Sequence, residues 1–187
     1  MTAKLIYSGI LSLDGYTADL DGNFDWSEPD EEVHQFVNDQ ERSVGAYLLG
    51  RKMYEVLQVW ETWDVSDEPE VIRDYADIWR AASKVVYSTT LDSVSTGLTT
   101  VQRSFDPDFV RALLASSDSD ISIGGPTLAA HALHAGLVDE ISMYVSPVIV
   151  GGGLRFLPEG LPLDLELVEE RRFGNGVVWL RYGVVPS

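Results

Sequence analysis

Two junctions, at which an apolar strand passes through glycine directly into an amphipathic helix, constrain the fold of this chain more than any other feature. They read Gly50-Arg51-Lys52-Met53, after residues 46–49, and Gly124-Gly125-Pro126-Thr127, after residues 121–123. Proline suits the first position of a helix, because the N–H group that it lacks has no helical partner there. Repeated strand-to-helix order is typical of βα units, so the junctions predict an α/β protein.

The rest of the chain continues this alternation and ends in a pair of strands. Hydrophobic periodicity predicts helices over residues 30–41, 51–60, 72–82, 107–114 and 126–136. Strands are predicted over residues 4–13, 46–49, 84–88, 98–101, 121–123, 140–150, 163–173 and 177–185, with Asn175-Gly176 in a final hairpin turn. We therefore expect a single domain, residues 1–187. Its central sheet is mixed but mostly parallel, has eight strands flanked by helices, and ends in an antiparallel hairpin.

Composition excludes several classes of partner and site. The net charge of −17 disfavours binding to nucleic acid and to anionic membranes. Cysteine is absent, and His131 and His134 lack the HExxH pattern of a zinc helix, so no metal site is expected. The N-terminus has no signal-peptide pattern and no apolar run reaches 18 residues, which indicates a cytoplasmic protein.

The two glycine junctions suggest a nucleotide with separated phosphates. A helix N-terminus presents unpaired N–H groups and a partial positive charge, which attract phosphate. Arg51 and Lys52 add cations to a chain that otherwise repels anions. The chain lacks both GxGxxG and GxxxxGK[ST], which argues against a Rossmann dinucleotide site and a P-loop. The alternative is structural, because paired glycines also let a helix approach a strand closely.

Three further segments have both a functional and a structural interpretation. Ser88-Thr89-Thr90 follows a strand and offers hydroxyl groups to a 2′-phosphate, or forms an ordinary turn. The turn over residues 12–18, which contains Asp14 and Tyr16, can place backbone against a flat ring. Trp26, in the loop of residues 14–29, is a candidate pocket residue. Acidic residues near Asp30 suit a helix N-terminus, and one that faces a pocket could supply a proton.

Taken together, these segments resemble the dihydrofolate reductase-like superfamily. The similarity is greatest to the reductase domain of the bifunctional riboflavin-biosynthesis deaminase/reductase and to its stand-alone relatives. It spans nearly the whole chain and is carried by three motifs: Ser12-Leu13-Asp14-Gly15, Leu49-Gly50-Arg51-Lys52-Met53-Tyr54-Glu55, and Ile123-Gly124-Gly125-Pro126-Thr127-Leu128 with Gly136-Leu137-Val138-Asp139-Glu140. Gly136-Leu137-Val138-Asp139-Glu140 is the most specific part.

The resemblance implies NADPH bound across the sheet and a homodimer. Arg51, Ser88 and Thr89 would hold the 2′-phosphate. Gly50, Lys52 and Met53 would lie at the first helix start, and Gly124, Gly125, Pro126 and Thr127 would hold the pyrophosphate. Thr17 and Ala18 would approach the nicotinamide. Glu32 is the candidate proton source, although Glu31 is almost as plausible; Asp14 would orient the substrate or the loop, and Trp26 and Tyr16 would contact the substrate.

We expect an NADPH-dependent reductase of a small heterocyclic or sugar-imine substrate. The reaction would resemble that of 5-amino-6-(5-phosphoribosylamino)uracil reductase or of dihydrofolate reductase. The loop over residues 19–29 contains no arginine or lysine, which disfavours a ribose-phosphate substrate. The alternatives are a non-catalytic NADP-binding sensor or partner module on the same fold, and a true dihydrofolate reductase.

Overall fold

The computed structural model describes residues 3–186. Its main sheet has eight strands in the order β5-β4-β3-β6-β1-β7-β10-β9. These strands are β1 (Leu5–Ser12), β3 (Val44–Gly50), β4 (Ser83–Tyr87), β5 (Thr99–Gln102), β6 (Asp120–Gly124), β7 (Glu140–Ser146), β9 (Leu165–Arg172) and β10 (Val178–Val184). The pairings from β5 to β7 are parallel, and β10 pairs antiparallel with both β7 and β9. The predicted sheet, with its antiparallel C-terminal edge, is confirmed.

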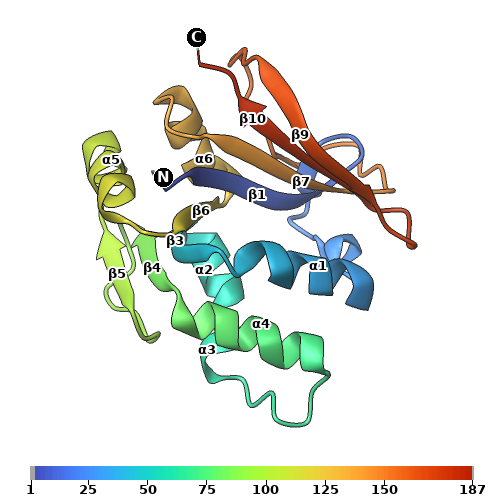
Figure 1. The fold of residues 1–187 in the computed structure, drawn as a ribbon, viewed down its shortest axis with the longest axis horizontal. Helices are drawn as coiled ribbons and strands as arrows, with labels where there is room; N and C mark the ends of the chain where they lie inside the picture. The colour runs from blue at the N-terminus through green and yellow to red at the C-terminus, as the bar shows by residue number, and fades with distance from the viewer. Residues whose placement is uncertain (1–2, 187) are drawn as a thin grey trace.

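Helices cover both faces of the sheet (Figure 1). They are α1 (Glu31–Glu41), α2 (Arg51–Leu57), α3 (Val59–Thr62), α4 (Glu70–Ala81), α5 (Pro107–Ser116) and α6 (Pro126–His134), with a short 3₁₀ helix, η1 (Asp25–Ser27). In Figure 1, α1 to α4 lie below the sheet, and α5 and α6 lie above it. Alternation along the strands supplies both layers: Leu48 packs on the α5 and α6 side, and its neighbours Tyr47 and Leu49 pack on the other.

The structure differs from the predicted elements in three places. The helix expected over residues 51–60 is divided into α2 and α3 at Gln58, whose carbonyl accepts from Glu61 N–H in a tighter turn. Strand β7 ends at Ser146, because Pro147 has no N–H group to continue the ladder. A second sheet, β2 (Tyr16–Ala18) with β8 (Leu154–Arg155), was not predicted, since each strand is too short to show a pattern.

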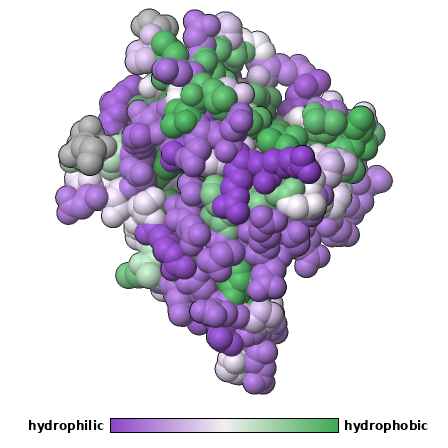
Figure 2. Space-filling model, turned by 45° about the vertical axis from the view of Figure 1, so that its right-hand side comes forward, coloured by the Kyte–Doolittle hydropathy of each residue, from purple (hydrophilic) through white to green (hydrophobic). Residues whose placement is uncertain are grey.

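The surface is largely polar. Figure 2 shows hydrophilic side chains over most of one face, with separate apolar patches between them. Among the described residues, none of the helices combines the length and the apolar character that a bilayer span requires.

Candidate active-site cleft

A cleft of about 1710 Å³ lies over the carboxyl ends of the central strands, where β3 and β6 pass into α2 and α6. Open α/β sheets bind ligands at this edge. All the residues assigned to the cofactor by resemblance line this cleft: Thr17, Ala18, Gly50, Arg51, Lys52, Met53, Ser88, Thr89, Gly124, Gly125, Pro126 and Thr127. The fold therefore brings together four segments that are far apart in the sequence.

The two glycine junctions face each other in this cleft. A Cβ atom added to Gly125 would lie 3.8 Å from the backbone nitrogen of Gly50 and 3.8 Å from Met53 Cβ. Gly125 has φ +96°, which an L-residue rarely adopts. Neither Gly50 nor Gly125 provides a side-chain cap, whereas the side chain of Asp30 caps α1 and that of Asp106 caps α5. The first N–H groups of α6 thus remain available to a ligand.

Cations and hydroxyl groups gather at one end of the cleft. Arg51 is exposed and its Nη1 donates to Glu55 Oε1 at 2.7 Å, one turn further along α2. Ser88 Oγ accepts from the N–H groups of Thr90 and Leu91, so Ser88 also shapes its own loop.

Arg103 joins this end of the cleft and was not among the sequence candidates. Its Nη1 donates to the Ser88 carbonyl at 3.1 Å and to the Leu91 carbonyl at 2.7 Å, and its side chain lines the cleft. Arg103 lies just beyond β5, and β5 lies beside β4, the strand that leads to Ser88. The sequence does not reveal that these two strands are neighbours, so it could not place Arg103 near Ser88.

Thr17 and Ala18 lie in β2, at the rim of the cleft beside β8. Thr17 Oγ1 donates to the Leu154 carbonyl at 3.2 Å, and Ala18 pairs with Leu154. Gly153 permits this pairing: it has φ +135°, and a Cβ there would overlap the Ala18 carbonyl oxygen. Of the three consecutive glycines over residues 151–153, Gly153 is therefore needed at the cleft rim, because a side chain there would collide with β2.

Asp14 and Tyr16 do not line the cleft. The Asp14 carboxylate accepts from Gly151 N–H at 2.8 Å and from Val150 N–H at 3.2 Å, which ties the first turn to the loop before β8. The Ser12 hydroxyl and these N–H groups hold the pKa of Asp14 below its ordinary value. The Tyr16 ring lies under the guanidinium of Arg155, 5.3 Å from ring centre to Cζ. This arrangement orients the loop.

Glu32 also lies outside the cleft. Its Oε2 accepts from Gly174 N–H at 3.0 Å, and its Oε1 is 3.5 Å from Arg171 Nη2. These contacts join the first turn of α1 to the C-terminal hairpin. Glu31 is exposed at the same turn and does not line the cleft either. The geometry gives Glu32 a structural connection and does not place it beside a bound substrate.

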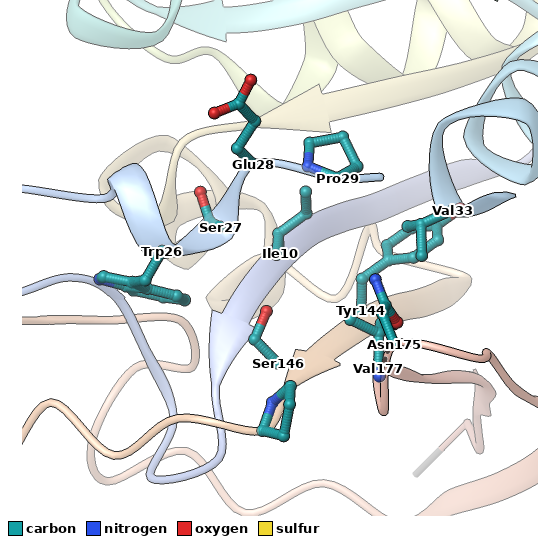
Figure 3. A pocket seen from close by; sticks show the side chains of 11 residues that line it. Ile10, Trp26, Ser27, Glu28, Pro29, Val33, Tyr144, Ser146, Asn175 and Val177 are labelled. Atoms are coloured by element: carbon teal, nitrogen blue, oxygen red, sulfur yellow. Dashed lines mark hydrogen bonds between the residues drawn. The ribbon is translucent and has the colours of Figure 1, made fainter. Parts of the chain in front are cut away.

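Trp26 lines a second, smaller pocket of about 210 Å³ (Figure 3). Figure 3 shows the indole ring on one side of this pocket and Tyr144 and Asn175 on the other, with Ile10 and Ser146 between them. Ile10 and Tyr144 line the large cleft as well, so the two hollows adjoin. The Trp26 Nε1 group is buried without a partner among the described residues. Trp26 is thus available to a ligand that extends from the cleft.

The inner part of the cleft contains an acid that the sequence analysis did not single out. Glu41, on the last turn of α1, lines the cleft with Tyr47 of β3, Tyr75 of α4 and Tyr144 of β7. Burial raises the pKa of Glu41 to about 7, and the nearby Tyr47 hydroxyl offsets part of that rise. Glu41 lies four residues after Val37 and therefore on the same face of α1. This helical spacing was the one feature of the sequence that could have placed Glu41 on the cleft side of the helix.

Comparisons with known proteins identify the family and the fold. A model of the family described as the RibD C-terminal domain matches residues 3–179. Among curated proteins, the chain is 25% identical over 184 residues to the uncharacterised protein YyaP of Bacillus subtilis strain 168. This match covers 96% of this chain and 94% of that relative.

Three solved structures show the same fold. A protein of Shewanella sp. PV-4, provisionally described as a riboflavin biosynthesis protein, has a TM-score of 0.75 and 22% identity over the full length of both chains. The Thermotoga maritima diaminohydroxyphosphoribosylaminopyrimidine deaminase/5-amino-6-(5-phosphoribosylamino)uracil reductase has a TM-score of 0.66 and 16% identity, over 98% of this chain and 57% of that chain. Dihydrofolate reductase of Enterococcus faecalis, in complex with NADP(H), has a TM-score of 0.63 and 13% identity, over 98% of this chain and 99% of that chain.

Proposed function

The chain belongs to the RibD C-terminal domain family, and we propose that it is an NADPH-dependent reductase of a small heterocyclic or imine-containing substrate. In this proposal, residues 1–187 form one reductase domain. The observation that carries the proposal is the convergence of both glycine junctions and the Ser88 loop on one cleft. The complex of the E. faecalis enzyme with NADP(H), on the same fold, supports the choice of cofactor.

The residues present fit such a cofactor. The α6 N-terminus at Gly125 has no side-chain cap and suits the pyrophosphate. Arg51, Thr89 and Arg103 suit the 2′-phosphate, because an extra phosphate needs cations that this strongly acidic chain otherwise lacks near the cleft. Thr17 and Ala18, held by β8, suit the nicotinamide end.

When bound, NADPH supplies hydride, and this chain supplies binding and alignment. The close approach of Gly50 and Gly125 would let the backbone N–H groups at the two helix starts hold one phosphate group together. The hydrogen bonds from the loop before β8 to Asp14 hold the turn that precedes Thr17 and Ala18, so these two residues would keep a fixed position for the nicotinamide.

The test has two stages. Titration of the purified chain with NADPH, followed by tryptophan fluorescence and by thermal shift, is expected to show saturable binding on the order of 1–100 µM. NADPH oxidation is then measured with pterins, flavin precursors and quinones as acceptors. Absence of binding would contradict the proposal. Binding without turnover across the panel would favour the non-catalytic NADP-binding module, and turnover that is sensitive to methotrexate would indicate a dihydrofolate reductase.

We also propose that the chain forms a homodimer through strand β9. All eight residues of β9 are exposed, including Leu165, Leu167 and Val168, and its outer edge has no strand partner among the described residues. Exposed sheet edges pair readily with a second copy across a two-fold axis. Light scattering of the purified chain distinguishes a dimer from a monomer, and Leu167→Lys is expected to shift a β9 dimer towards monomer.

A further inference from the structure

The sheet beneath the inner part of the cleft has a hollow floor. On the face that carries α1 and α4, β3 presents Tyr47, β6 presents Ser122 beside it, and β1 presents Ser8. Tyr144 of β7 follows on the far side of β1, where it is in register with Ile10. Because serine is much smaller than tyrosine, the two central strands leave space between the two phenol rings.

The helices above this floor supply a roof and one acid. Val37 and Glu41 project from α1, and Tyr75 projects from α4. Tyr75 packs edge-on against Trp60, with ring centres 4.8 Å apart. The walls of this space are therefore aromatic and aliphatic, which suits a planar ring.

Two polar groups in this space have no partner among the described residues. They are Glu41 Oε2 and the Tyr47 hydroxyl, which lie near each other without a hydrogen bond of regular geometry, and both atoms are shielded from solvent. An unpaired buried polar group is costly, and native structures rarely keep one without a role. A ligand with N–H donors directed at Glu41 would satisfy the carboxylate.

The charges along the cleft are separated. Among the described lining residues, the arginine and lysine side chains are Arg51, Lys52 and Arg103, and all three lie at the end formed by α2 and the Ser88 loop. Glu41 occupies the inner space, and Asp19, Asp21, Asp25 and Glu28 lie along the loop that borders the cleft. A phosphate group on a substrate in the inner space would lie near these carboxylates, and no arginine or lysine among the described lining residues would offset their repulsion.

We propose that the inner part of the cleft binds an uncharged, planar, N–H-bearing compound without a phosphate group, and that Glu41 anchors this compound. The proposal rests on the proposed function, because it takes the opposite end of the cleft as the NADPH site. It assigns this chain a substrate class different from the phosphoribosyl compound named for the T. maritima enzyme.

Binding at Glu41 is linked to pH. N–H donors favour the ionised carboxylate, whereas burial keeps the pKa of free Glu41 near 7. The groups that face Glu41 are Tyr47, Tyr75 and Tyr144, whose pKa values burial raises above the ordinary value, so they stay neutral. His34, beside Tyr75, has a pKa lowered by burial and is neutral at pH 8. Affinity should therefore rise between pH 6 and pH 8.

The experiment uses matched ring compounds with and without phosphate: riboflavin with FMN, and uridine with UMP. Dissociation constants are measured with and without saturating NADP⁺, at pH 6 and pH 8. We expect the uncharged member of at least one pair to bind at least tenfold more tightly than its phosphorylated counterpart, and severalfold more tightly at pH 8. Glu41→Gln should weaken this binding about tenfold and remove its pH dependence, with an unchanged NADP⁺ dissociation constant. Glu31→Gln, an exposed change on the same helix, is the control.

Equal or tighter binding of FMN and UMP would overturn the proposal, as would an unaffected Glu41→Gln variant or failure of all four compounds to bind a chain that binds NADP⁺. A chain that binds the uncharged compounds through Glu41 but does not bind NADP⁺ would leave the inner pocket standing and remove the proposed function. Thermal unfolding of each variant checks that it is folded.

Discussion

The backbone nitrogen of Gly50 lies 3.8 Å from the position that a Cβ atom on Gly125 would occupy. This approach joins the ends of β3 and β6, which are neighbours in the sheet and parallel, so both strands deliver their helices to the same edge. A side chain at Gly125 would fill the space between the two helix starts, since its Cβ would lie 3.8 Å from both Gly50 N and Met53 Cβ. The pair therefore forms the centre of the proposed pyrophosphate site.

Arg51→Ala is expected to weaken NADPH binding about 10- to 100-fold, because a charge-assisted hydrogen bond contributes about 1.5–3 kcal/mol. NADH, which lacks the 2′-phosphate, should bind almost as well as before. Fluorescence titration with both nucleotides measures the ratio of the two effects. Arg111→Ala is the matched control, because Arg111 pairs with Asp108 on the surface of α5 and does not line the cleft. Equal loss for NADPH and NADH would refute the 2′-phosphate assignment.

Gly153→Ala is expected to destabilise the chain much more than Gly151→Ala. Both glycines have positive φ, +135° and +78°, so alanine carries backbone strain at both. At Gly153 the added Cβ would also lie 2.8 Å from Asp19 Cα, whereas at Gly151 it would meet nothing within 4 Å. We expect the midpoint temperature of Gly153→Ala to be at least about 4–8 °C lower than that of Gly151→Ala, which corresponds to about 2 kcal/mol. Indistinguishable midpoints would show that the β2–β8 contact is loose.

Glu41 should make the stability of the chain depend on pH. Its pKa rises from 4.5 to about 7 on folding, so between these values the folded state binds more protons than the unfolded state. The contribution of Glu41 to the free energy of unfolding therefore falls as pH rises from 5 to 8, by roughly 2–3 kcal/mol. The Glu41→Gln side chain cannot ionise, so the variant should lose this dependence of stability on pH. Its stability relative to the unsubstituted chain should therefore increase as pH rises. Urea unfolding of both chains at pH 5 and pH 8 provides the measurement, and parallel pH profiles would contradict the burial of Glu41.

Glu32→Gln distinguishes a proton source from a structural contact. The contacts with Arg171 and Gly174 predict a modest loss of stability, about 0.5–1 kcal/mol, since the ion pair is largely exposed. Turnover of any acceptor that the chain reduces should change less than about twofold, with the same pH profile. A large fall in turnover, with a shifted pH profile and an unchanged midpoint temperature, would instead return Glu32 to the role of proton donor.

Sequence reasoning was most successful where local chemistry dictates structure. Glycine before a helix, proline at its first turn and alternation along strands are local signals, and they predicted both junctions and the sheet with its C-terminal hairpin. They could not predict β2 and β8, whose short strands are held by a backbone approach at Gly153.

The amino-acid sequence by itself determined which segments become strands and helices, and which of them carry groups suited to an anion, because these properties depend on neighbours within a few residues. Only the tertiary structure decided which of those groups share a cleft. Arg103 reaches Ser88 because β5 lies beside β4. Glu41 shares the cleft with Tyr47 because α1, whose apolar face packs on Tyr144 and Trp179, brings its last turn beside Tyr47. The same packing directs Glu32 to the C-terminal hairpin. Burial, and with it the raised pKa of Glu41, arises from contacts among distant segments, which no local pattern records.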